Sequence, residues 1–106
     1  MSKPFDMQLA RDFLTKLHSC VNTHDAATIA SLCTEDVVWD DPAATKPLIG
    51  RNAVRQFHID GMFRALPDVT IELIDGPYLS ADRQGIAVRT RIRGTMTGPL
   101  NPPGFA

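Results

Sequence analysis

The sequence is poor in the residues that metal centres, disulfide frameworks and nucleic-acid interfaces require. Only two cysteines occur among 106 residues, and Cys20 and Cys33 match no metal-binding spacing and are too few for a disulfide framework. Each falls in an apolar helical pattern, so we interpret both as small buried hydrophobic residues. The chain has eleven basic and twelve acidic residues. This lack of a basic excess argues against a general nucleic-acid binder.

Long apolar runs are also missing. No run approaches the roughly 18 residues of a membrane-spanning helix, and the first residues lack the apolar core of a signal peptide. We therefore expect a cytoplasmic protein that makes no membrane contact. With 43% hydrophobic and 22% charged residues over a length of 106, the composition is that of an ordinary globular chain with one domain and one core.

Hydrophobic periodicity predicts three helices in the first two-thirds of the chain. The first covers residues 6–23, and a short second helix covers residues 26–33, with Asp25 as its N-cap. The third runs over residues 51–66 and carries His58 on its inward stripe. The helices therefore precede most of the strands, which is typical of an α+β protein.

A short strand is predicted over residues 37–42, between the second and third helices. Its β-branched and aromatic residues end at a proline. Side chains alternate along a strand, so Trp39 and Asp41 share one face while Asp40 points outward into solvent. Residues 43–50 are expected to form a loop.

Two long strands over residues 69–77 and 85–98 are predicted to form an antiparallel hairpin. One face of the second strand carries apolar residues and a threonine, namely Ile86, Val88, Thr90 and Ile92. The other face carries Arg89, Arg91 and Arg93, which we interpret as a solvated or dimer-facing surface rather than a contact for an anionic ligand or nucleic acid. Residues 98–106 are rich in proline and are expected to form a loop.

The order of these elements resembles that of the nuclear transport factor 2-like superfamily, which includes SnoaL-like polyketide cyclases and ketosteroid isomerase. Five short motifs between residues 9 and 98 carry the resemblance: Asn22-x-x-Asp25, Leu32-x-x-x-Asp36-Val37-Val38-Trp39-x-Asp41-Pro42, Gly50, Ala65-Leu66-Pro67-Asp68 and Gly94-x-x-x-Gly98. The resemblance implies a cone-shaped α+β fold. In this fold three helices pack on a strongly curved, mostly antiparallel sheet and enclose a deep apolar pocket.

Chains of this superfamily normally continue for about two more strands. We therefore expect residues 1–106 to form a single SnoaL-like domain that is incomplete at its C-terminus and lacks the last strands. The chain is then a fragment, or a partner supplies the missing strands, or the protein dispenses with them. An open sheet edge needs a cover, so a homodimer is expected.

Asp41 and His58 are the candidate catalytic residues that the resemblance implies. Asp41 resembles the general base of ketosteroid isomerase, the carboxylate immediately before the proline at the end of the first strand. Burial over an apolar cavity disfavours the charged form of a carboxyl group and would make it a better base. The alternative is that Asp41 only caps a turn before Pro42.

His58 matches the position of a pocket tyrosine in ketosteroid isomerase. An imidazole there could polarise a carbonyl group or relay a proton. The alternative is a histidine at the edge of the core, satisfied by a backbone carbonyl. His18 and His24 are expected on the surface. The three histidines share no metal-ligand spacing, so no metal site is expected.

The chain departs from ketosteroid isomerase at Leu17, where that enzyme places a tyrosine that donates a hydrogen bond to the developing enolate. Leucine donates nothing, and the isomerase's other pocket acid would lie past Ala106. A strict ketosteroid isomerase is therefore not expected. The side chains expected to line a substrate pocket are Leu17, Trp39, Phe57, Met62 and Phe63. For the last four, the alternative is that they form plain core.

The sequence thus predicts a SnoaL-like protein with a pocket for a small hydrophobic molecule. As an enzyme it would need no cofactor and would isomerise, cyclise or hydrate a carbonyl or polycyclic compound, with Asp41 taking the proton and His58 assisting. The alternative is a non-catalytic ligand-binding or dimerisation module of the same fold.

Overall fold

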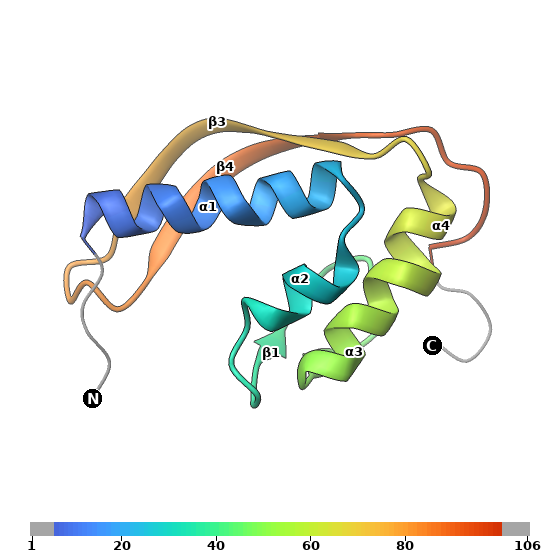
Figure 1. Ribbon diagram of the computed structural model, residues 1–106, viewed down its shortest axis with the longest axis horizontal. Coiled ribbons are helices and arrows are strands. Elements are labelled where there is room, and N and C mark those ends of the chain that lie inside the picture. Colours follow the sequence, from blue (N-terminus) through green and yellow to red (C-terminus); the bar gives the residue numbers. More distant parts are fainter. Residues whose placement is uncertain (1–5, 101–106) are drawn as a thin grey trace.

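The fold, taken from a computed structural model that describes residues 6–100, combines helices with two small antiparallel sheets (Figure 1). This arrangement confirms the expected α+β class and is compatible with a cone whose sheet is not closed. No helix in the described residues is long and apolar enough to cross a membrane.

Two carboxylates start the first two helices, as the sequence predicts for Asp25. Helix α1 spans Met7–Asn22, and its N-cap Asp6 accepts a hydrogen bond from the backbone N–H of Leu9. Helix α2 spans Ala26–Ser31, and Asp25 accepts hydrogen bonds from both the backbone N–H and the hydroxyl of Thr28. The two bonds from backbone N–H groups each satisfy a donor that the first turn of a helix leaves without a partner.

The predicted short strand is shorter in the structure and has a partner that the sequence did not predict. Strand β1 covers Val38–Trp39 and pairs with strand β2, Leu48–Ile49, inside the segment expected to be a loop. Two residues carry too little periodicity to be recognised, and their pairing across a loop is a tertiary event. The expected alternation holds, because the Val38 side chain is exposed and the Trp39 side chain is half-buried.

The third helix follows the predicted path but changes its hydrogen-bonding pattern in the middle. Helix α3, Arg51–Gln56, continues as the π-helical segment η1, Phe57–Met62, and ends as helix α4, Phe63–Ala65. The predicted third helix is therefore present, and the sequence did not predict that its middle segment η1 is π-helical. A π-helical turn adds a residue to the turn, and such segments are frequent at functional sites.

The predicted hairpin is present, with different ends. Strand β3 spans Thr70–Leu79 and continues past Pro77, and strand β4 spans Ile86–Arg93. The second strand does not reach residue 98, because Thr95 and Thr97 bond to the end of the third helix and to the turn that follows it. Thr95 donates two hydrogen bonds to the Asp68 carboxylate, and the N–H of Thr97 donates to Ala65. Residues 98–100 are irregular, as expected, and the rest of the predicted tail lies outside the described residues.

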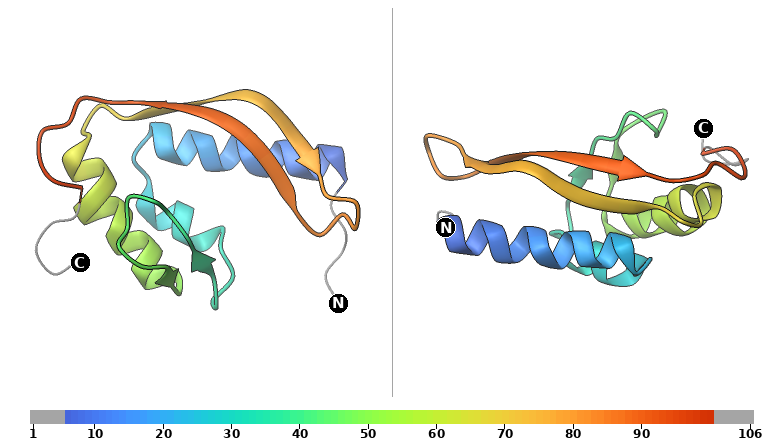
Figure 2. Two further views of the ribbon diagram at one scale, coloured as in Figure 1. Left: turned by 180° about the vertical axis from the view of Figure 1, so that it is seen from behind. Right: turned by 90° about the horizontal axis from the view of Figure 1, so that it is seen from above.

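The hairpin of β3 and β4 lies across one side of the helices (Figure 1). Viewed from above, α1 runs along the hairpin on the side of β3 (Figure 2), in agreement with the packing of α1 against β3. The end of the hairpin where β3 begins and β4 finishes lies beside α4, the last part of the third helix (Figure 1). The largest fully buried side chains are those of Phe57, Ile29, Val54 and Val69. Ile29 and Val54 form a core cluster with Cys20, so the core lies between α1, α2 and α3.

The two cysteines are free, and Cys20 is buried in the core as expected. Cys33 is only half-buried and packs at the edge of the same core. Burial raises the pKa of both thiols, which favours the uncharged, hydrophobic form of each side chain.

Candidate functional site

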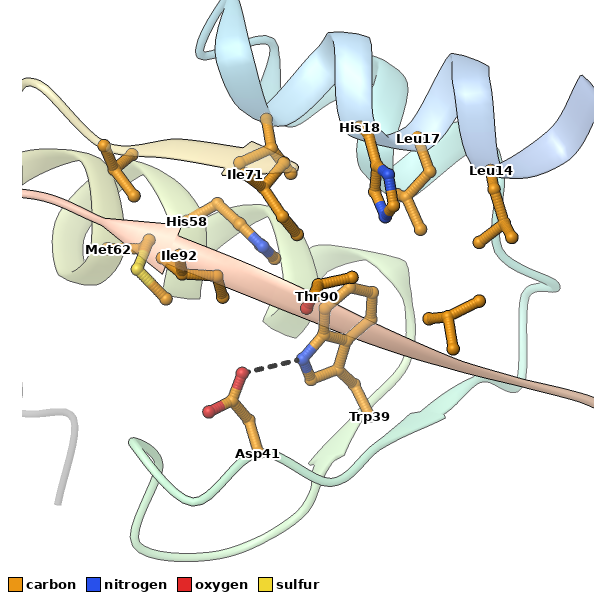
Figure 3. A pocket seen from close by; sticks show the side chains of 13 residues that line it. Leu14, Leu17, His18, Trp39, Asp41, His58, Met62, Ile71, Thr90 and Ile92 are labelled. Atoms are coloured by element: carbon orange, nitrogen blue, oxygen red, sulfur yellow. Dashed lines mark hydrogen bonds between the residues drawn. The ribbon is translucent and has the colours of Figure 1, made fainter. Parts of the chain in front are cut away.

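A cavity of about 200 Å³ lies between the hairpin, helix α1, strand β1 and the η1 segment (Figure 3). Most of its lining is apolar, from Leu14, Leu17, Val21, Trp39, Met62, Val69, Ile71, Val88 and Ile92. Four further lining residues carry titratable or hydroxyl groups, namely His18, Asp41, His58 and Thr90. An apolar hollow with a few convergent polar groups is the usual form of a small-molecule site.

Asp41 caps a turn and also lines this cavity, so its two sequence-based interpretations are geometrically compatible. Its Oδ1 accepts a hydrogen bond from the backbone N–H of Ala43 at 2.9 Å, so Asp41 caps a turn that contains Pro42. Its Oδ2 accepts a hydrogen bond from the indole Nε1 of Trp39 at 3.3 Å (Figure 3). The two donors hold the carboxylate in one orientation at the cavity wall. The exposed Asp40 lies beside it in sequence, outside this lining.

His58 is the most deeply buried polar residue of the cavity, with 4% of its surface exposed. Its Nδ1 lies 2.8 Å from the carbonyl oxygen of Val54. Because a carbonyl only accepts hydrogen bonds, Nδ1 carries the proton and the neutral ring has its lone pair on Nε2. Burial lowers the pKa of His58, and the Val54 hydrogen bond and the charge of Asp41 oppose this shift. The neutral ring is therefore a proton acceptor toward the cavity, which suits a proton relay and not the polarisation of a carbonyl.

His18 lines the cavity, which corrects the expectation that it lies on the surface. It comes from α1 and is half-buried, and its ring points into the hollow (Figure 3). Burial lowers its pKa. Periodicity missed His18 because it lies outside the apolar stripe that packs into the core. An apolar stripe identifies the helix face that packs against other side chains, whereas the side chain of His18 faces a hollow.

His24 is also half-buried, contrary to expectation. Its ring stacks on Phe63 with the ring centres 4.5 Å apart, and its Nε2 lies 3.4 Å from the carbonyl oxygen of Val69. The turn between α1 and α2 places His24 at a positive φ of 57°. It borders the core but is not among the residues that line the cavity.

The five side chains expected to line a pocket separate into two groups. Leu17, Trp39 and Met62 line the cavity. Phe57 is fully buried and packs edge-on against His58, with ring centres 5.3 Å apart. Phe63 packs against the core cluster and His24. Phe57 and Phe63 therefore support the cavity from behind its lining.

Thr90 was not singled out by the sequence, although alternation correctly placed it on the inner face of β4. It is half-buried and lines the cavity. A single threonine in an alternating strand carries no recognisable signal. No group of three or more side chains suited to hold a metal ion occurs in residues 6–100.

A family model for the SnoaL-like domain matches residues 14–105. The matched region includes the whole lining of the cavity. A search of curated proteins finds no match to the chain.

Proposed function

The chain belongs to the family of SnoaL-like domains, within the nuclear transport factor 2-like superfamily, and on that premise we propose that its cavity binds a small, mostly apolar carbonyl compound and catalyses a cofactor-free acid–base step on it. The observation that carries this proposal is a single apolar cavity wall that includes both the Asp41 carboxylate and the His58 ring. Isomerisation, cyclisation and hydration all begin with such a proton transfer.

The volume of the cavity narrows the class of ligand. An apolar protein cavity of about 150 Å³ accommodates benzene, and the cavity here measures about 200 Å³. This size favours a compound of one or two rings over a larger polycyclic one. Burial of apolar surface would supply most of the binding free energy.

Asp41 is the proposed proton acceptor and His58 the residue that assists it. The Asp41 carboxylate is held by Trp39 and by the backbone of Ala43. The Nε2 lone pair of His58 can take the proton onward and return it to another atom of the same ligand. Protonated His58 would be stabilised by the charge of Asp41, which already acts on the ring.

Deuterium exchange tests this proposal without knowledge of the natural ligand. Cyclohexanone in D₂O exchanges the protons next to its carbonyl group, and proton NMR follows the loss. We expect the protein to accelerate this exchange and Asp41→Asn to reduce the acceleration by about 100-fold or more. Asp40→Asn, one residue away and exposed, is the matched control and should leave the rate unchanged. An unchanged rate in Asp41→Asn would show that Asp41 is not the base.

A non-catalytic ligand-binding or dimerisation module is the second candidate. It is favoured by Leu17, which supplies no hydrogen-bond donor where the related isomerase has a tyrosine. The hairpin also leaves apolar side chains such as Ile92 and Tyr78 about half exposed, each at 52%. Ligand binding without any exchange of cyclohexanone protons would support this candidate.

We further propose a cytoplasmic homodimer, in which a second copy covers an open edge of the hairpin. Sedimentation equilibrium measures the oligomeric state directly. A monomer at high protein concentration would contradict the dimer.

A further inference from the structure

The polar groups of the cavity are unequally divided between acceptors and donors of hydrogen bonds. Asp41 and the Nε2 of His58 accept. The indole N–H of Trp39 is directed at Asp41. A carbonyl oxygen of a ligand accepts hydrogen bonds, so none of these three groups can hold it while Trp39 stays on Asp41. The donor must come from another wall of the cavity.

His18 has the required properties. Its ring makes no hydrogen bond to any residue between 6 and 100, and every fully buried side-chain nitrogen or oxygen atom in that range has a partner. The ring nitrogens of His18 therefore keep accessible surface, and the ring points into the cavity (Figure 3). Burial lowers the pKa of His18, so near neutral pH the ring is uncharged and offers one N–H donor and one lone pair.

The position of His18 complements that of Asp41. His18 extends from α1 and Asp41 from the loop after β1, and the two side chains enter the cavity from opposite walls (Figure 3). A carbonyl oxygen directed at His18 therefore leaves the rest of the ligand directed across the cavity toward Asp41 and His58. When a proton leaves the carbon next to the carbonyl group, negative charge develops on that oxygen, where a fixed donor stabilises it.

We propose that His18 donates the hydrogen bond that recognises the carbonyl oxygen of the ligand, and that the ligand is a small ketone or a related carbonyl compound. This inference deepens the proposed function and rests on it. Leu17, the preceding residue, contributes only apolar surface to the cavity. His18 thus supplies, one position later on α1, the hydrogen-bond donor that Leu17 lacks.

Two probes of the same shape separate recognition of the oxygen from burial of the ring. Cyclohexanone carries a carbonyl group, and methylenecyclohexane carries a CH₂ group in its place. Binding is followed by the fluorescence of Trp39, the single tryptophan of the chain, which lines the cavity. The variants are His18→Phe, which keeps a ring without a donor, and His18→Gln, which keeps a donor. Thr90→Val tests the hydroxyl of Thr90, which is the other possible hydrogen-bond donor in the lining.

We expect His18→Phe to weaken the binding of cyclohexanone by about fivefold, the effect of one neutral hydrogen bond. The binding of methylenecyclohexane should change by less than about twofold, and His18→Gln should restore most of the affinity for cyclohexanone. Thermal unfolding of each variant verifies that the fold is intact.

The possible failures are distinguishable. If the unmodified protein binds neither probe, the proposed small-molecule function is overturned and this inference falls with it. If both probes bind and His18→Phe leaves their ratio unchanged, only the role of His18 is overturned. If Thr90→Val alone changes the ratio, the donor is Thr90, and the inference about His18 is equally overturned.

Discussion

The side-chain amide of Asn22 forms hydrogen bonds in both directions with the backbone of Ile71. Its Nδ2 donates to the Ile71 carbonyl at 3.2 Å, and its Oδ1 accepts from the Ile71 N–H at 2.7 Å. Asn22 is the last residue of α1, and Ile71 lies on β3 and lines the cavity. The pair therefore fastens the helix that carries His18 to the hairpin that covers the cavity. Together with the cap at Asp25, it accounts physically for the Asn22-x-x-Asp25 motif.

Removal of this amide should destabilise the protein. Asn22→Ala loses both hydrogen bonds, and we expect the free energy of unfolding to fall by about 1–2 kcal/mol, as for exposed neutral bonds. Urea denaturation measures the change. Asn22→Asp is the matched control, because it keeps the acceptor for the Ile71 N–H and should cost less. Equal stability of Asn22→Ala and the unmodified protein would contradict a fastening role.

The burial of His58 predicts a loss of stability in mild acid. Burial lowers its pKa from the usual 6.5, so between the two values the unfolded chain binds more protons than the folded protein. The free energy of unfolding is therefore highest above pH 6.5 and falls as the pH drops through the lowered value. Burial of His18 acts in the same direction.

Urea denaturation at about pH 7.5 and about pH 5.5 tests this expectation. The unmodified protein should be less stable at the lower pH, and His58→Phe should reduce the difference because it removes one of the titrating groups. The same difference in both proteins would mean that His58 is not buried in its neutral form.

Filling the cavity should weaken ligand binding without loss of the fold. Val88 lies on the inner face of β4 with 36% of its surface exposed, so a larger side chain there has room to enter the hollow. We expect Val88→Phe to weaken the binding of cyclohexanone by about tenfold or more, a cost of roughly 1.4 kcal/mol. Titration of Trp39 fluorescence measures the affinity, and thermal unfolding measures the stability.

The neighbouring substitution Ala87→Phe is the control for this prediction. Ala87 is exposed and alternation places it on the opposite face of β4, so the same increase in volume should leave binding unchanged. Equal weakening by both substitutions would indicate a general effect on the hairpin and not occupation of the cavity.

Local patterns in the sequence were sufficient for several elements of the fold and for one wall of the site. Capping by Asp25 depends on residues three positions away, and the alternation that aligns Trp39 with Asp41 depends on residues two positions away. Interactions of this range involve residues that are close together in the sequence, which is why these predictions agree with the structure.

Other features depend on residues that meet only in three dimensions. Strand β2 exists because Leu48–Ile49 pairs across a loop with Val38–Trp39. Strand β4 ends at Arg93 because Thr95 forms hydrogen bonds with Asp68. The sequence by itself determined the helices, the hairpin and the inward side of β1 and β4, since these follow from capping and periodicity. Tertiary structure alone decided that a hollow remains between them and that His18 borders it, because periodicity reports which side chains pack and cannot report where packing leaves a gap.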